Sequence, residues 1–160
     1  MRQIPYASTV GSLMYAMLCT RPNICYSVGV VSRYQSNPGP KHWQAVKHIL
    51  KCLRRTRNYM LVYQCEDLIP IGYTDSDFQS DLDFRKSTLG CVFTLRDGAI
   101  SWRSVKQSYI VVSTLEAEYV VACEATKEAV WLKKFLFDLG VVRMEQVPIT
   151  LLCYNSGAVA

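Results

Sequence analysis

The stretch IPIGYTD, residues 69–75, decides the fold, because it predicts a buried strand that ends on a carboxylate. The next segment, residues 76–88, is polar and carries the further acids Asp77, Asp81 and Asp83. Carboxylate oxygens gathered at the end of a strand are the ligands that Mg²⁺ requires. A solvated turn is the more frequent explanation of such a cluster, so the spacing alone gives only weak support to a metal site.

Strands and one long helix are predicted around this stretch. Runs of β-branched and apolar residues predict further strands at 60–65, 89–96, 99–103 and 149–153, and Asp97-Gly98 predicts a hairpin turn. Ser113 and Glu116 form a capping box that starts a helix over residues 114–139. Because crossover connections are right-handed, the last strand should lie parallel to the first strand of the sheet.

The N-terminal part of the chain predicts helices, over residues 9–19, 22–35 and 41–56. Charge divides the chain in the same region. Residues 1–65 contain nine Lys and Arg and no acid, whereas the remainder contains nine basic and thirteen acidic residues. We therefore predict two domains, a helical, basic one at 1–58 and a sheet domain at 59–160. The fold class is α/β with an α+β start: a short helical segment, then a mixed sheet with one long helix.

The third predicted helix carries most of the basic charge of the N-terminal domain. Its candidate nucleic-acid-binding residues are Lys41, Lys47, Lys51, Arg54, Arg55 and Arg57. Apolar residues such as Trp43 and Val46 recur at helical spacing, so the basic residues occupy the other faces. Nucleic acid is the commonest large anion for such a surface, and a solvated helix face explains it equally well.

Composition excludes several classes of protein. Half of the 160 residues are hydrophobic and 19% are charged, as in globular proteins. The seven cysteines include no CxxC pair and no Cys–His zinc spacing, which favours free thiols. No apolar run reaches the length of about 18 residues that a transmembrane helix needs. Residues 1–20 form a weak candidate signal peptide, with Arg2 ahead of the apolar stretch 10–19.

Short motifs follow one another in a fixed order from residue 72 to residue 158. They are Gly72-Tyr73-Thr74-Asp75-Ser76-Asp77, Arg85-Lys86-Ser87-Thr88, Gly90-Cys91-Val92-Phe93, Ile100-Ser101-Trp102, Lys106-Gln107, Ser113-Thr114, Glu116-Ala117-Glu118-Tyr119, Ala129-Val130-Trp131-Leu132 and Tyr154-Asn155-Ser156-Gly157-Ala158. In this order they resemble the ribonuclease H domain of copia-type retrotransposon polyproteins. Upstream motifs such as Thr20-Arg21-Pro22-Asn23-Ile24 resemble the end of the reverse transcriptase in the same polyproteins. The resemblance covers nearly the whole chain and implies a truncated ribonuclease-H-like sheet.

The resemblance implies a two-metal mechanism, in which Mg²⁺ ions activate water to cut the RNA strand of an RNA–DNA hybrid. It places one metal-binding carboxylate at Asp75. The match of Ala117-Glu118-Tyr119 to the family pattern places the next at Glu118. Glu116 is disfavoured, because side chains two residues apart point in nearly opposite directions on a helix and only one can face the sheet.

The third carboxylate of the family falls where this chain has Tyr154. A phenol, with a pKa of about 10, is neutral at pH 7 and is a poor ligand for Mg²⁺. A fourth carboxylate would lie beyond residue 160. We therefore expect no enzyme but a degenerate ribonuclease H site with vestigial Asp75 and Glu118, no bound metal and no cofactor. Mg²⁺ is expected only if ribonuclease H activity persists.

The chain also resembles the secreted RxLR effector proteins of oomycetes that share this sequence type. Its RxLR-like residues are Lys51, Leu53 and Arg54, which differ from Arg-x-Leu-Arg at the first position, and only Glu66-Asp67 follows as acidic residues. This resemblance implies secretion, then entry into the cytoplasm or nucleus of a plant host cell. It also implies a host plant protein as partner and suppression of immunity or cell death.

We take the effector role as the first expectation. The alternative is an inactive retrotransposon remnant in the cytoplasm that still binds an RNA–DNA hybrid or another nucleic acid. A second alternative is an active Mg²⁺-dependent ribonuclease H. None of these expectations includes a membrane partner.

Overall fold

The computed structural model describes residues 4–63, 68–81, 84–142 and 148–153. It divides the chain into two compact units, residues 1–61 and 62–160. Each unit has a hydrophobic core of its own. No described helix is long and apolar enough to cross a membrane.

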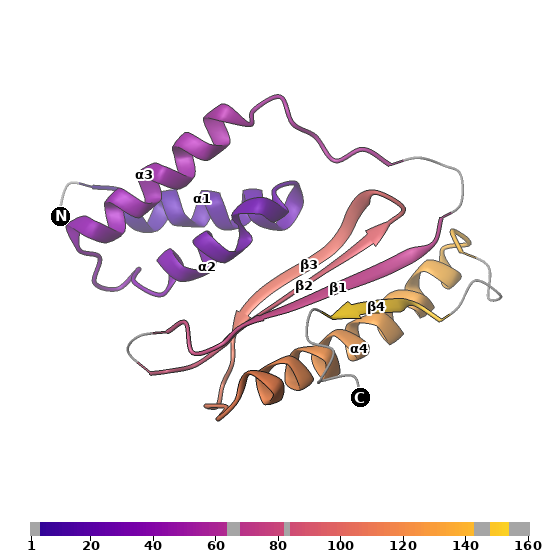
Figure 1. Ribbon diagram of the computed structural model, residues 1–160. Helices are drawn as coiled ribbons and strands as arrows, with labels where there is room; N and C mark the ends of the chain where they lie inside the picture. The colour runs from indigo at the N-terminus through magenta and orange to yellow at the C-terminus, as the bar shows by residue number, and fades with distance from the viewer. Residues whose placement is uncertain (1–3, 64–67, 82–83, 143–147, 154–160) are drawn as a thin grey trace. The chain divides into compact units, whose positions relative to one another are not determined.

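The helical unit contains α1 (Tyr6–Cys19), a short 3₁₀ helix η1 (Pro22–Ile24), α2 (Cys25–Ser32) and α3 (Pro40–Arg55) (Figure 1). Its core consists of Tyr6, Val10, Leu13, Ile24, Val28, Val31, Val46 and Ile49. The buried Tyr6 hydroxyl donates a hydrogen bond of 2.8 Å to the carbonyl oxygen of Val31, which ties α1 to the end of α2. The helix predicted over 22–35 is shorter in the structure. It begins with the 3₁₀ turn at Pro22, and its α-helical part ends at Ser32.

Helix α3 begins at Pro40, in the first-turn position that tolerates proline because it needs no N–H donor. The backbone N–H of Gly39 donates to Nδ1 of His42 at 2.8 Å, which satisfies a group that the helix itself leaves unpaired. The His42 ring stacks on Tyr34, with ring centroids 3.9 Å apart. Two aromatic side chains thus fix the start of α3.

The sheet unit is a four-stranded mixed sheet with the strand order β3-β2-β1-β4. Its strands are β1 (Pro70–Asp77), β2 (Thr88–Leu95), β3 (Gly98–Lys106) and β4 (Thr150–Cys153), with the long helix α4 (Thr114–Asp138) between β3 and β4. Strand β1 pairs antiparallel with β2 and parallel with β4. The predicted fold class and the predicted parallel pairing of the last strand are therefore confirmed.

The core of the sheet unit lies between the sheet and α4 (Figure 1). Alternate residues of β2 face the helix and pack against small and apolar side chains of α4, namely Cys91, Phe93 and Leu95 against Ala125, Ala129, Leu132 and Leu136. Gly72 pairs with Phe93, and a Cβ atom there would meet Leu151 and lie 2.7 Å from the Phe93 ring. The absence of a side chain at residue 72 therefore allows this close packing.

The segment before β1 differs from the prediction. A strand was expected over 60–65, but residues 60–63 form none, and 64–65 lie outside the described residues. Tyr63 of this segment instead contacts the hairpin through its side chain, because its hydroxyl donates to the carbonyl oxygen of Ala99 at 2.7 Å.

The hairpin turn between β2 and β3 is shifted by one residue from the predicted Asp97-Gly98. Arg96 takes the left-handed conformation, with φ of 54°, and Gly98 is already the first residue of β3.

Candidate functional site

Two acidic side chains from different elements, β1 and α4, lie near enough for their charges to interact. Asp75 lies on β1 opposite Gly90 of β2 and is exposed. Glu118 lies in the second turn of α4 and is only 7% exposed. The backbone N–H of Ser76, the residue after Asp75, hydrogen-bonds to the Glu118 carboxylate. The structure therefore brings together the two carboxylates that the sequence pointed to.

Glu116 has a different role, although it is also an acid in the first turns of α4. Its backbone N–H donates to Oγ of Ser113 at 3.1 Å. In return, its Oε2 accepts from the backbone N–H of Val112 at 2.9 Å. These reciprocal bonds are those of a capping box, so the carboxylate of Glu116 is occupied in starting the helix.

Glu118 is in an unfavourable place for a negative charge. Burial raises the pKa of its carboxyl, the nearby charge of Asp75 raises it further, and the hydrogen bond from Ser76 partly opposes both effects. Oε2 of Glu118 is buried and has no hydrogen-bond partner among the described residues. A proton or a cation bound at Oε2 of Glu118 would therefore give this buried oxygen the partner that it lacks.

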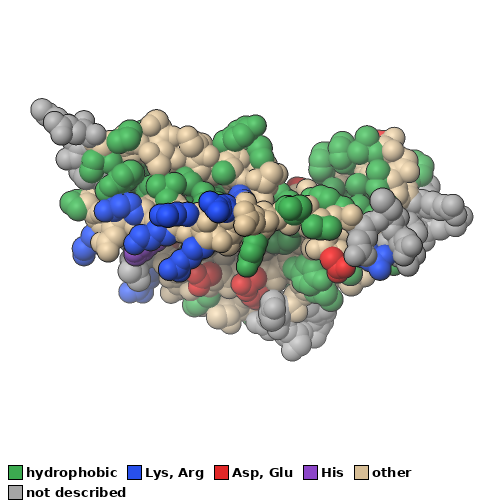
Figure 2. All heavy atoms as spheres, turned by 90° about the horizontal axis from the view of Figure 1, so that it is seen from above, with side chains coloured by type: hydrophobic (Ala, Val, Ile, Leu, Met, Phe, Trp, Pro, Cys, Tyr) green, Lys and Arg blue, Asp and Glu red, His purple; other side chains and the backbone are tan. Residues whose placement is uncertain are grey.

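Helix α3 provides the second candidate site, a basic surface. Its buried residues Val46 and Ile49 lie on one side. All six predicted nucleic-acid-binding residues are exposed: Lys41, Lys47, Lys51, Arg54, Arg55 and, just after the helix, Arg57. Figure 2 shows Lys and Arg side chains gathered in a band along this helix. With no acid among residues 1–65, this surface has no carboxylate of its own unit to neutralise it.

Comparison of the sequence with known proteins identifies its family. The chain is 53% identical over 147 residues, 92% of its length, to the retrovirus-related Pol polyprotein from transposon TNT 1-94 of Nicotiana tabacum. It is 36% identical over 154 residues to the Pol polyprotein from transposon RE1 of Arabidopsis thaliana. The chain belongs to the copia-type retrotransposon Pol family. It spans about 11% of the TNT 1-94 polyprotein and 10% of that of RE1.

A further relative of this Pol-derived chain is much shorter. The chain is 44% identical over 133 residues to the protein named Secreted RxLR effector protein 161 of Plasmopara viticola. That match covers 82% of the chain and 94% of the relative. No protein-family model matches the chain, and no solved structure matches it.

The described residues of this Pol chain do not complete a two-metal site. Such a site needs three or four carboxylates around its ions. Within the described ranges, no group of three or more His, Cys, Asp or Glu side chains is placed to hold a metal. Asp81 forms an ion pair with Lys106 instead. Asp83 and Tyr154 lie outside the described residues, and the described pairing of β4 ends at Cys153, opposite Thr74.

The RxLR-like residues lie inside α3 rather than in an extended segment. Lys51 and Arg54 are exposed, but the Leu53 side chain packs against the core of the helical unit. The acids Glu66 and Asp67 lie outside the described residues. The helix thus presents only the basic members of this motif.

The candidate signal segment, residues 1–20, is largely part of the folded helical unit. Residues 4–20 contain α1, whose Tyr6, Val10 and Leu13 are all buried in the core, while residues 1–3 lie outside the described ranges. Removal of this segment would therefore take three of the core residues away from the unit.

Sequence reasoning missed Gln107. This side chain is 4% exposed, and neither its Oε1 nor its Nε2 has a hydrogen-bond partner among the described residues. It lines a pocket between the sheet and α4. The motif Lys106-Gln107 marked the position, but only the tertiary structure reveals that the amide is buried.

Proposed function

We propose that this chain is a non-catalytic, Pol-derived protein that binds single-stranded or hybrid nucleic acid through the basic surface of α3. The observation that carries the proposal is the row of six exposed Lys and Arg side chains in a unit without acids. Such a surface displaces counterions from phosphates, so its binding depends on charge more than on sequence.

The salt dependence of binding tests this proposal. We expect the affinity of the full chain for a fluorescent single-stranded RNA to fall steeply as salt concentration rises. Replacing Lys47, Lys51 and Arg54 with Gln removes three phosphate contacts and should reduce the slope of log affinity against log salt by about 2. Lys133, Lys134 and Arg85, three exposed residues of the sheet unit, provide the matched control when all are changed to Gln. Equal losses in both variants, or no binding at low salt, would contradict the proposal.

Lack of catalysis is supported by Tyr154, which stands where the resemblance requires a carboxylate. A two-ion site that lacks a bridging carboxylate loses the electrostatic stabilisation on which hydrolysis depends. We expect no cleavage of an RNA–DNA hybrid in Mg²⁺ or in Mn²⁺ above the level of the Asp75→Asn variant. Cleavage that the Asp75→Asn change abolishes would establish a working ribonuclease H.

A second candidate role is that of a secreted RxLR-type effector that acts on a plant host protein. One comparison favours it: the effector relative of Plasmopara viticola is covered over 94% of its length. Export followed by action in the cytoplasm or nucleus of a host cell belongs to this candidate. Expression with a C-terminal tag, followed by mapping of the N-terminus in the medium, tests it. An intact chain that stays in the cells would exclude classical secretion.

A further inference from the structure

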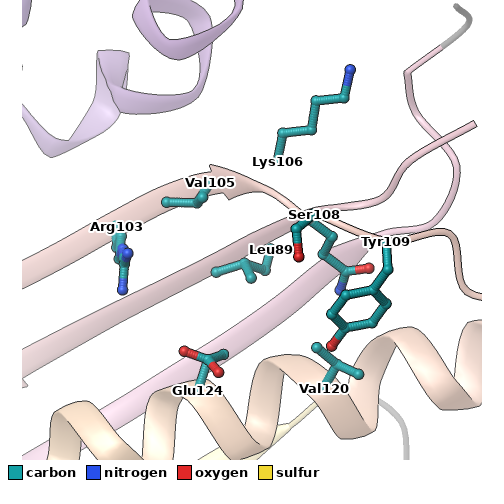
Figure 3. A pocket seen from close by; sticks show the side chains of 9 residues that line it. Leu89, Arg103, Val105, Lys106, Ser108, Tyr109, Val120 and Glu124 are labelled. Carbon is teal, nitrogen blue, oxygen red and sulfur yellow. The ribbon is translucent and has the colours of Figure 1, made fainter. Parts of the chain in front are cut away.

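A pocket of about 240 Å³ lies in the sheet unit between the end of β3 and α4. Neither Asp75 nor Glu118 lines it. Leu89 and Val120 provide apolar walls. Figure 3 shows Tyr109 and Val120 at one end of the pocket and Arg103 and Glu124 at the other, whereas Lys106 extends away from the space. The pocket therefore combines an aromatic and apolar end with a charged end.

The buried amide of Gln107 is the feature that indicates a ligand. The backbone of Gln107 is fixed, because its N–H donates to the carbonyl oxygen of Ser87 at 2.9 Å. Its side chain lines the pocket, and among the described residues neither the amide nitrogen, a donor, nor the amide oxygen, an acceptor, has a hydrogen-bond partner. A buried amide without partners is unfavourable, and a ligand that offers an adjacent donor and acceptor satisfies both atoms at once.

The charged end of the pocket has a guanidinium available. Glu124 is bound mainly by Lys127, whose ammonium donates to Oε1 at 2.6 Å. That hydrogen bond lowers the pKa of Glu124, and the charge of Arg103 adds a smaller effect. Arg103 is itself exposed, and a guanidinium has five donors, so a weak interaction with Glu124 leaves donors for an anionic group at the mouth.

The base and the phosphate of a nucleotide each have a counterpart in this pocket. A glutamine amide pairs with the N6 and N7 edge of adenine through two hydrogen bonds. A base stacks on an aromatic ring, which Tyr109 presents, and its phosphate suits the guanidinium of Arg103. We propose that this pocket binds an adenine nucleotide, either free or at an unpaired position of a nucleic acid strand. The inference extends the proposed nucleic-acid binding to a second site, in a different unit from α3.

Binding of AMP to the full chain tests the assignment. We expect saturable AMP binding by titration calorimetry, and weaker binding of GMP and UMP. Gln107→Met keeps the size of the side chain and should lower the affinity for AMP by about tenfold or more. It should not lower the melting temperature, because no hydrogen bond to a described residue is lost.

Matched variants separate this site from the surface of α3. Gln79→Met is the control for the amide, because Nε2 of Gln79 donates to the carbonyl oxygen of Val111 at 3.4 Å and its loss should affect stability rather than AMP binding. The variant with Lys47, Lys51 and Arg54 changed to Gln should keep AMP binding even if it loses RNA binding. Arg103→Gln should weaken binding of AMP but not of adenosine.

Competition by a short oligoadenylate distinguishes the two sources of the nucleotide. Displacement of AMP by the oligoadenylate indicates a strand, and binding of AMP without displacement indicates a free nucleotide. Absence of AMP binding, or equal AMP affinity in the wild type and in Gln107→Met, would overturn the proposal and would assign the amide to ordered water. Neither result depends on whether α3 binds RNA.

Discussion

Glu118 combines burial, a like charge and an unpaired oxygen within one side chain. Each of these disfavours the ionised carboxylate, and only the hydrogen bond from Ser76 favours it. Because the folded protein raises the pKa of Glu118, the folded state binds this proton more tightly than the unfolded chain does. The resulting stabilisation is complete below the unfolded-state pKa of about 4.3 and is lost as pH rises through the folded-state pKa.

We predict that Glu118→Gln stabilises the protein near neutral pH. The amide keeps an oxygen for the N–H of Ser76 but carries no charge, so the free energy of unfolding should rise by on the order of 1 kcal/mol at pH 7. Chemical denaturation at pH 4 and pH 7 measures the effect, which should be small at pH 4. A loss of stability at pH 7 would show that the charge of Glu118 is compensated.

Asp75→Asn provides the companion measurement, because it removes the repulsion and leaves the buried carboxylate in place. It should stabilise less than Glu118→Gln does, since burial is the larger cause of the raised pKa. The double variant should gain less than the sum of the two single variants, because the two side chains interact.

At the level of elements, His42 caps the start of α3. His42 accepts the hydrogen bond of the Gly39 N–H and stacks on Tyr34. His42→Ala should therefore lower the free energy of unfolding of the helical unit by about 1 kcal/mol, the usual effect of losing a side-chain cap. Thermal denaturation followed by circular dichroism measures it. His48→Ala, an exposed position on the same helix, should have little effect, and equal losses would contradict the capping role.

Most elements could be predicted from periodicity together with cap and turn residues. The helix over 114–139 has an apolar stripe and its own capping box, and the structure ends it one residue earlier, at Asp138. The strand expected over 60–65 was wrong in the part that is described. Met60 and Val62 are largely exposed, and Tyr63 contacts the hairpin through its hydroxyl. A run of apolar residues in the sequence does not distinguish such a segment from a paired strand.

The candidate site was predictable only in part. Asp75 and Glu118 came from a resemblance and from helix phase, and the structure brings them together. Gln107 was missed, because nothing in its neighbours along the chain indicates that its amide is buried without a partner. Burial depends on contacts between β3 and α4, which local spacing does not contain.

On the scale of the whole molecule, the chain has two separate cores. Val28→Ala removes buried methyl groups from the core of the helical unit and should destabilise that unit by about 2 kcal/mol. Hydrogen exchange should rise across α1, α2 and α3 and stay unchanged in the strands of the sheet unit. Val130→Ala, at an exposed position of α4, is the control. Equal loss of protection in both units would show that they unfold together.

The buried carboxylate of Glu118 also has an evolutionary consequence. A carboxylate that weakens folding persists only while selection maintains it or while too little time has passed for its loss. Where no function requires the charge, neutral drift should exchange Glu118 for glutamine or an apolar residue earlier than it alters the buried alanines of α4. A carboxylate retained at this position in related chains would therefore indicate that its charge is still used.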